Sequence, residues 1–348
     1  QSLESLEPPE LRNARCTMFG QCLVDLIGVL AVLMRYPDDV DRLSDDEVDD
    51  LKRHRYDVAD VLRDVCHILG GVQCLRQVVF LLEQELATLH TLPRPDEPGS
   101  WQGIEACLFA IRSMGKEIPP NEETIVPKIL EMLPGLPGNS YVRYTATLIV
   151  GKYAEWMKLH PEHLSLMFNL LMEGFSSPDV MPAAATAIKN LCHSCGELMG
   201  EQVLGLLRGK LLEAKAREEH RINLKDELEL LEGLSHVVST LPPDAAVVAI
   251  RQLVEPMATG LQTSGVAGGD AKVAQQELDR LTVVVSYAKP TLQAGREHPV
   301  AMVVRELWPV LQVVSAHHQS SDQVFEKLNR FFKHAMRTCK GHFEPLLK

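Results

Sequence analysis

The sequence lacks a long hydrophobic run and an excess of basic residues. Its longest unbroken apolar stretch, residues 26–34, falls well short of the roughly 20 residues that a membrane-spanning helix needs. The opening segment 2–13 is polar and acidic and has no apolar core of the kind that a signal peptide carries. The net charge of −12 repels a phosphate backbone. We therefore expect no membrane span and no direct nucleic-acid binding, and we expect partners that are basic or that dock on a local basic patch.

The sequence also gives no sign of a disulfide framework. A chain of 348 residues, of which 45% are hydrophobic, is long enough to fold around a large core without covalent links. Its cysteines lie scattered in amphipathic segments, so we interpret them as reduced core thiols, which are typical of a cytosolic or nuclear protein. The eight positions are 16, 22, 66, 74, 107, 192, 195 and 339.

Apolar residues recur with helical spacing along nearly the whole chain. In the segments 104–111 and 164–171 they stand at i, i+3, i+4 and i+7, the pattern of a helix with one buried face. Strand-like alternation is almost absent, and the β-branched stretch 282–285 lies inside a longer helical pattern. The sequence therefore predicts an all-α protein.

Helix-breaking residues divide this pattern into helix-sized pieces. Capping pairs such as Ser44 with Glu47 and Ser320 with Gln323 predict where several helices begin. Taken two at a time, the helices give a unit of roughly 40 residues, which is typical of HEAT-type repeats in an α-solenoid. We expect one continuous array over 1–348, with longer or irregular helices around 214–241. Because the chain opens on Gln1, we interpret it as an internal fragment of a longer protein.

Motifs for catalysis or metal binding are incomplete. The pair Cys192 and Cys195 forms a CxxC, but no second ligand pair follows at the spacing that zinc requires. The doublet His317-His318 has no nearby cysteine or carboxylate set and is interpreted as an ordinary surface feature. The Gly-Lys pairs lack the rest of a phosphate-binding loop, and the segment 233–237 lacks the second glycine of a nucleophile elbow. We expect no catalytic residue, no metal and no cofactor.

A cationic ladder is predicted on one helix near the end of the chain. Beginning near Ser321, the apolar residues 324, 328, 331, 332 and 335 form one stripe, and the basic residues form a fan about 120° wide on the opposite face. Charge runs usually indicate a solvated helix face. On a chain of −12, however, such a ladder is also suited to bind phosphoserines or acidic side chains through charge-assisted hydrogen bonds. The ladder consists of Lys327, Arg330, Lys333 and Arg337.

An acidic cluster near the beginning of the chain is the second charged feature. Carboxylates in the first turn of a helix interact favourably with the helix dipole, by about 0.3–1 kcal/mol each, which accounts for residues 45–47 without any partner. A basic partner surface remains the alternative. The cluster consists of Asp45, Asp46, Glu47, Asp49 and Asp50.

Over nearly its whole length the chain resembles the transportin-SR family of importin-β-type nuclear import receptors. The resemblance is carried by extended segments rather than by one motif. They include Arg55-Tyr56-Asp57-Val58-Ala59-Asp60, Glu105-Ala106-Cys107-Leu108-Phe109, Val142-Arg143-Tyr144-Thr145 and Glu306-Leu307-Trp308-Pro309.

The resemblance implies a receptor that moves between cytoplasm and nucleus. It implies as partners proteins with arginine-serine (RS) domains, phosphorylated when bound, together with Ran-GTP, which releases the cargo, and phenylalanine-glycine (FG) nucleoporins. The arginine-rich helix that reads cargo in this family would place its basic positions on the ladder of residues 327–337. This sequence departs from the family by carrying two lysines there and the neutral Gln323. The acidic cluster is the candidate for a secondary Ran contact. The alternative function is a passive helical-repeat scaffold for protein assembly.

Overall fold

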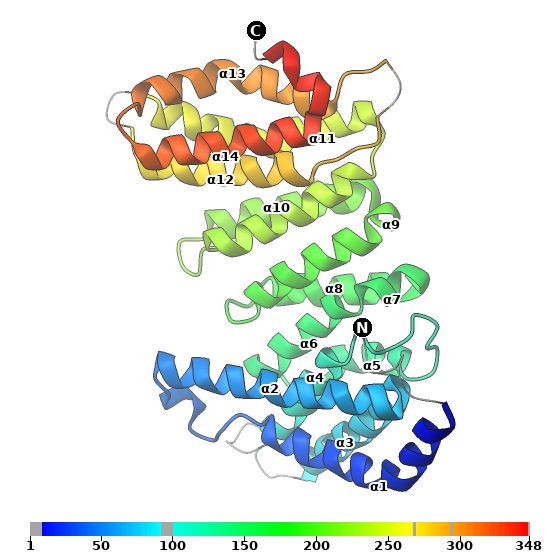
Figure 1. Ribbon diagram of the computed structural model, residues 1–348. Coiled ribbons are helices and arrows are strands. Elements are labelled where there is room, and N and C mark those ends of the chain that lie inside the picture. The colour runs from blue at the N-terminus through cyan, green and yellow to red at the C-terminus, as the bar shows by residue number, and fades with distance from the viewer. Residues whose placement is uncertain (1–8, 92–99, 267–268, 293–294, 347–348) are drawn as a thin grey trace. The chain divides into compact units, whose positions relative to one another are not determined.

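The computed structural model describes residues 9–91, 100–266, 269–292 and 295–346. Within these ranges all regular structure is helical and no strand occurs (Figure 1). The predicted all-α solenoid class is confirmed. The chain forms two compact units, Gln1–Ala187 and Ile188–Lys348, which are described one by one. The single continuous array over 1–348 stays a prediction.

The first unit begins with three long helices, and shorter ones follow. In chain order they are α1 (Pro9–Leu33), η2 (Val40–Arg42), α2 (Asp45–Leu69), α3 (Gly71–Thr91), α4 (Gln102–Ser113), α5 (Val126–Met132), η3 (Leu133–Gly135), α6 (Ser140–Lys152), α7 (Ala154–Leu159), η4 (Pro161–His163), α8 (Leu164–Gly174) and the beginning of α9 (Met181–Ala216).

Helix α4 lies at the centre of the first unit. It packs against α3 and α6, and every residue from Gln102 to Ile111 is buried. This burial includes Glu105, whose carboxylate accepts hydrogen bonds from Arg55 of α2 (2.5 Å) and from the Thr145 hydroxyl of α6 (2.7 Å). The Arg55 guanidinium also lies over the rings of Tyr36 and Phe109, at 4.0 and 4.1 Å. A buried ion pair therefore ties α2 and α4 together, and the Thr145 hydroxyl links it to α6.

The second unit contains the rest of α9 and five further helices. They are α10 (Leu224–Ser239), α11 (Pro243–Ser264), α12 (Ala271–Tyr287), α13 (Pro299–His317) and α14 (Asp322–Cys339), followed by η5 (Lys340–Leu346). Helix α9 is interrupted at Gly200, whose φ of 65° and ψ of −173° are not helical. Only glycine adopts such a backbone conformation at little cost, so this residue divides α9 into two differently packed halves.

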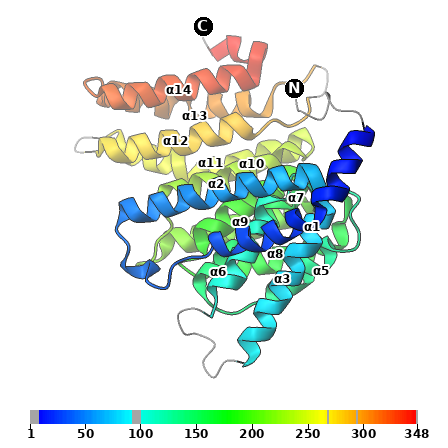
Figure 2. The same ribbon diagram turned by 60° about the horizontal axis from the view of Figure 1, so that its bottom comes forward.

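The second unit has two layers of helices. One layer holds the first half of α9 with α10, α12 and α14. Helices α12 and α14 lie side by side in it (Figure 2). The other holds the second half of α9 with α11 and α13, linked by Arg208 to Gln252 and by Arg251 to Glu306. Residues that meet within a layer are 40 to 55 residues apart in sequence.

Of the two predicted capping pairs, one is confirmed and the other is displaced by one residue. Ser44 and Glu47 form the predicted capping box at the start of α2. At α14 the cap is Ser321 rather than Ser320, because the hydroxyl of Ser321 accepts from the Val324 amide. The stretch 282–285 is helical, within α12. The segment 214–241 consists of the end of α9, a non-helical link and the regular helix α10.

Two side-chain predictions were wrong. Cys22 is exposed, because α1 buries Ile27, Leu30 and Met34 and turns Cys22 away from that face. The other cysteines with described side chains are buried and free, as predicted, while the side chain of Cys16 lies outside the described residues. His318 is buried rather than at the surface, because its Nε2 lies 2.8 Å from the Ser264 carbonyl oxygen of α11.

Helix α13 meets the length and composition that a membrane-spanning helix requires. Its apolar window has a mean hydropathy of 1.2, and 44% of that window is buried inside the protein. A core helix of a globular protein passes the same test, and α13 packs against both α11 and α14. Its apolar character is therefore accounted for by helix packing.

Candidate functional site

The cationic ladder lies on α14 as the sequence predicted. Four residues of the apolar stripe (Val324, Leu328, Phe331 and Ala335) are buried, and Phe332 is half-buried against Trp308. Arg330, Lys333 and Arg337 are exposed on the other side. The two arginines therefore share an accessible face, as the predicted site requires.

Lys327 differs from the other three basic residues because it already has a partner. Its ammonium group lies 2.8 Å from the carboxylate of Asp279 in α12, and both side chains are mostly buried, at 26% and 16% exposure. Arg330 reaches the same carboxylate at 4.0 Å but remains 59% exposed. The positive charge at the N-terminal end of the ladder is thus largely compensated by the neighbouring helix.

The C-terminal end of the ladder stays uncompensated. Within the described ranges no carboxylate lies within 4 Å of Lys333 or Arg337. His334 lies among these cations, and its Nδ1 is 2.7 Å from the Ser286 hydroxyl of α12. Partial burial, and then repulsion from Arg330, Arg337, Lys333 and Lys289, lower the pKa of His334. Lys289, from the segment after α12, therefore belongs to the same positive patch.

Sequence reasoning missed Asp279, Lys289 and His334 as parts of this surface. A period of 48 residues would have found the first contact, because 279 pairs with 327, 275 with 323 and 286 with 334 at that spacing. The helical stripe on α14 alone carries no such information, since the partners come from the adjacent helix of the same layer.

Three of the five carboxylates of the acidic cluster have partners on α2 or at its N-cap. Glu47 accepts from the backbone amide and hydroxyl of Ser44, and these hydrogen bonds lower its pKa. Asp49 pairs with Lys52 at 3.0 Å and Asp50 with Arg53 at 2.9 Å. All five carboxylates of the cluster are exposed. The assignment of this cluster to Ran stays a prediction.

The CxxC segment forms part of a helix interface. Cys192 and Cys195 are buried, and burial next to Cys195 raises the pKa of Cys192 to about 12, so its thiolate is disfavoured at neutral pH. His193 meets His236 of α10 with Nδ1 atoms 3.5 Å apart. Among the described residues no group of three or more metal-binding side chains is present.

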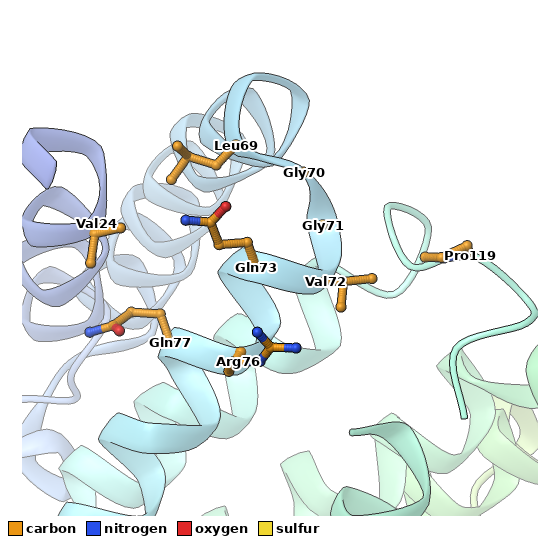
Figure 3. A pocket seen from close by; sticks show the side chains of 9 residues that line it. All are labelled: Val24, Leu69, Gly70, Gly71, Val72, Gln73, Arg76, Gln77 and Pro119. Atoms are coloured by element: carbon orange, nitrogen blue, oxygen red, sulfur yellow. The ribbon is translucent and has the colours of Figure 1, made fainter. Parts of the chain in front are cut away.

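One groove of the first unit lies at the turn between α2 and α3 (Figure 3). Its walls include Val24, Leu69, Gln73 and Pro119, and among the described lining residues only Arg76 is charged. A nucleophile paired with a base, which acid–base or acyl-transfer chemistry needs, is not among its lining residues.

Two family models match parts of the chain. The Transportin-3/Importin-13 third TPR domain matches residues 123–208, and the fourth TPR domain of the same proteins matches residues 298–348. The second match contains all of α13 and α14, and with them the ladder.

Relatives of known sequence extend the similarity over the whole chain. Transportin MOS14 of Arabidopsis thaliana is 28% identical over 94% of this chain, and the mRNA transport regulator MTR10 of Saccharomyces cerevisiae is 26% identical over 99%. An uncharacterized protein of Schizosaccharomyces pombe, C11G11.07, is 27% identical over 93%. The chain spans only 34% to 35% of the length of these relatives.

Solved structures show the same fold at lower identity. Kap121p bound to Pho4p and Kap121p bound to Nup53p each match 99% of this chain and 33% of theirs, with a TM-score of 0.69 and identities of 17% and 16%. The family models and the relatives show that this chain is similar to transportins and importins. The fold alone follows from the structures, since their identity to this chain is low.

Proposed function

We propose that this chain is the part of a transportin-SR-type nuclear import receptor that binds the RS domains of Ser/Arg-rich cargo proteins. The binding element is the ladder Lys327, Arg330, Lys333 and Arg337 on α14. The receptor binds phosphorylated cargo in the cytoplasm, releases it to Ran-GTP in the nucleus and passes FG nucleoporins on the way. It recognises proteins and catalyses no reaction.

The observation that carries this proposal is the exposed cationic face of α14 on a chain with a net charge of −12. This face lies within the segment that matches the fourth Transportin-3/Importin-13 domain. A disordered ligand rich in phosphoserine presents closely spaced dianions, which pair with Arg and Lys through charge-assisted hydrogen bonds. Charge complementarity therefore favours such a ligand over a basic or neutral one.

The two lysines of the ladder affect how phosphate is recognised. Arginine offers a planar fork that binds two phosphate oxygens at once, whereas lysine acts as a point charge with rotatable donors. Arg330 and Arg337 therefore supply the oriented contacts, and Lys333 supplies charge between them. Lys327 contributes least, because Asp279 already compensates it.

Release by Ran-GTP follows from linkage. If cargo and Ran-GTP prefer different conformations or overlapping surfaces, each lowers the affinity of the other by the same coupling free energy, typically about 1–3 kcal/mol. The acidic cluster Asp45, Asp46, Glu47, Asp49 and Asp50 is our candidate for a secondary Ran contact. Asp45 and Asp46 are the two members of the cluster for which no partner from the same helix is described.

The central test replaces all four ladder cations with alanine and titrates a phosphorylated RS peptide. We expect the dissociation constant to rise by at least about 100-fold, since several charge-assisted contacts are lost. Raising the salt concentration should weaken binding to the wild-type chain steeply, because exposed ionic contacts are screened. Unchanged affinity in the quadruple variant would reject the site.

A matched control separates the ladder from net charge. Replacing another two arginines and two lysines of the second unit removes the same formal charge without touching α14, and affinity should change by less than about threefold, because distant exposed charges are screened. The control residues are Arg208, Arg221, Lys225 and Lys272.

Addition of Ran-GTP to the full-length receptor with bound cargo tests whether Ran-GTP releases the cargo. Indifference to Ran-GTP would favour a passive scaffold instead.

A further inference from the structure

The positive patch on the second unit includes two residues, His334 and Lys289, that belong neither to the ladder nor to the family resemblance. Four cations act on the imidazole of His334 and lower its pKa: Arg330, Lys333 and Arg337 from α14 itself, and Lys289 from the segment that follows α12. No described carboxylate within 4 Å compensates Lys333, Arg337 or Lys289. The excess charge is therefore concentrated around residue 334 and not around residue 327, where Asp279 lies.

The His334 ring is held in one orientation by a chain of hydrogen bonds. The Ser286 hydroxyl lies 2.5 Å from the Thr282 carbonyl oxygen and 2.7 Å from Nδ1 of His334. A carbonyl oxygen only accepts, so the hydroxyl donates its single proton to Thr282. It must then accept from His334, which places the imidazole proton on Nδ1. Nε2 is left unprotonated, with no hydrogen-bond partner among the described residues.

Lys289 is also fixed at its backbone. Its amide donates to the Ser239 hydroxyl of α10 at 2.8 Å, which anchors the end of α12 to the neighbouring helix of the same layer. Its side chain is exposed and carries no described ion pair. The segment thus presents a cation beside α14 from a different element, and the patch is wider than one helix face.

We infer that His334 and Lys289, together with Lys333 and Arg337, form a proton-coupled binding site for the phosphate group of a phosphoserine. This inference rests on the proposed function and names the ligand group and the residues that bind it. A neutral Nε2 has only a lone pair to offer and would repel an anion. When a phosphate dianion approaches, Nε2 takes up a proton and donates it as a hydrogen bond. The arriving negative charge offsets the repulsion from the four cations that favours the neutral ring in the free protein.

The groups that face His334 determine the sign of the pH dependence. They are the cations Arg330, Lys333, Arg337 and Lys289 and the uncharged Ser286. All the charged ones disfavour the imidazolium in the free chain, and only the ligand favours it. Binding therefore takes up protons, and affinity rises as the pH falls from 8 towards 6.5, until the phosphate itself becomes protonated near its second pKa of about 6.

Calorimetry of the full chain with a phosphorylated RS peptide tests this site. Titrations at pH 7.5 in buffers of different ionisation enthalpy measure the number of protons taken up, which we expect to be about 0.5–1 for the wild-type chain. In His334→Asn the side-chain amide can still donate to Ser286 but cannot be protonated, so the uptake should disappear. His334→Gln serves as a second variant if the first fails to fold. Equal proton uptake in wild type and variant would overturn the role of His334.

Lys289 is tested by affinity. Lys289→Ala should lower the affinity for the phosphorylated peptide by about five- to tenfold, the effect of one charge-assisted contact. Lys272→Ala and His317→Asn, also in the second unit, should leave this affinity unchanged. An unaffected Lys289 variant would remove that residue from the site. Binding of the unphosphorylated or glutamate-substituted peptide with the same proton uptake would reject a phosphate site. Failure of the wild-type chain to bind the phosphorylated peptide at all would reject the proposed function as well.

Discussion

Helices α2 and α14 are both amphipathic and richly charged, yet the charges of α2 are mostly paired and those at the C-terminal end of α14 are not. On α2, Arg55 is buried against Glu105, and Asp49 and Asp50 pair with basic residues one turn further along the same helix. On α14, Asp279 pairs with Lys327 at 2.8 Å and with Arg330 at 4.0 Å, while Lys333 and Arg337 have no carboxylate within 4 Å among the described residues. A run of charge therefore becomes a candidate site only where neighbouring elements leave it uncompensated.

The difference has a simple energetic reason. A buried charge without a partner is energetically costly. Removing either Arg55 or Glu105 would therefore leave the other charge buried and uncompensated. An exposed charge costs almost nothing to keep unpaired, because water solvates it. The α14 cations are thus free to exchange water for a ligand, whereas the α2 pair serves only the fold.

The largest expected effect comes from breaking the buried pair. Arg55→Met should lower the free energy of unfolding of the first unit by about 3–5 kcal/mol, because Glu105 would stay buried without a cation. Urea denaturation followed by circular dichroism measures this loss. The double variant Arg55→Met/Glu105→Gln should recover part of it, since no buried charge remains. A loss below about 1 kcal/mol in the single variant would contradict the structural role of the pair.

A smaller effect is expected at the local cap of the acidic cluster. Ser44→Ala should cost about 1 kcal/mol of stability, the usual contribution of an N-cap, because the Glu47 amide loses its acceptor and the Glu47 carboxylate loses one of its two donors. Ser44→Thr keeps the hydroxyl and should be nearly neutral. Thermal denaturation distinguishes the two variants. Equal melting temperatures of the two variants would mean that the Ser44 hydroxyl does not stabilise the first turn of α2.

The smallest effect should come from the carboxylate of Asp279, which pairs with Lys327. Asp279→Asn removes the charged partner of Lys327. It should raise the affinity for the phosphorylated RS peptide by about threefold, which lies within the range of about 0–1 kcal/mol for a partly exposed ion pair. Asp244→Asn, whose partner is Arg296 of the same unit, is the matched control and should not tighten binding. Weaker binding in the Asp279 variant would mean that Asp279 orients the ladder instead of compensating it.

Much of the site was predictable from local pattern. The apolar stripe of α14 fixed which face is buried, and the exposure of Arg330, Lys333 and Arg337 followed from it. The Ser44 capping box was equally predictable, since its two partners are three residues apart. His318 and Cys22 were not, because their surroundings depend on which helices pack beside them.

By itself, the sequence determined that the chain is helical, where its helices begin and end, and which face of each helix is apolar. These properties depend on residues within one or two turns of each other, and helix formation is governed by such local interactions. Only the tertiary structure decided that Asp279 compensates Lys327 and that Lys289 joins His334 in one positive patch. Those contacts join adjacent helices of one layer across some 48 residues of sequence, and the stacking that brings them together is set by core packing rather than by any local pattern.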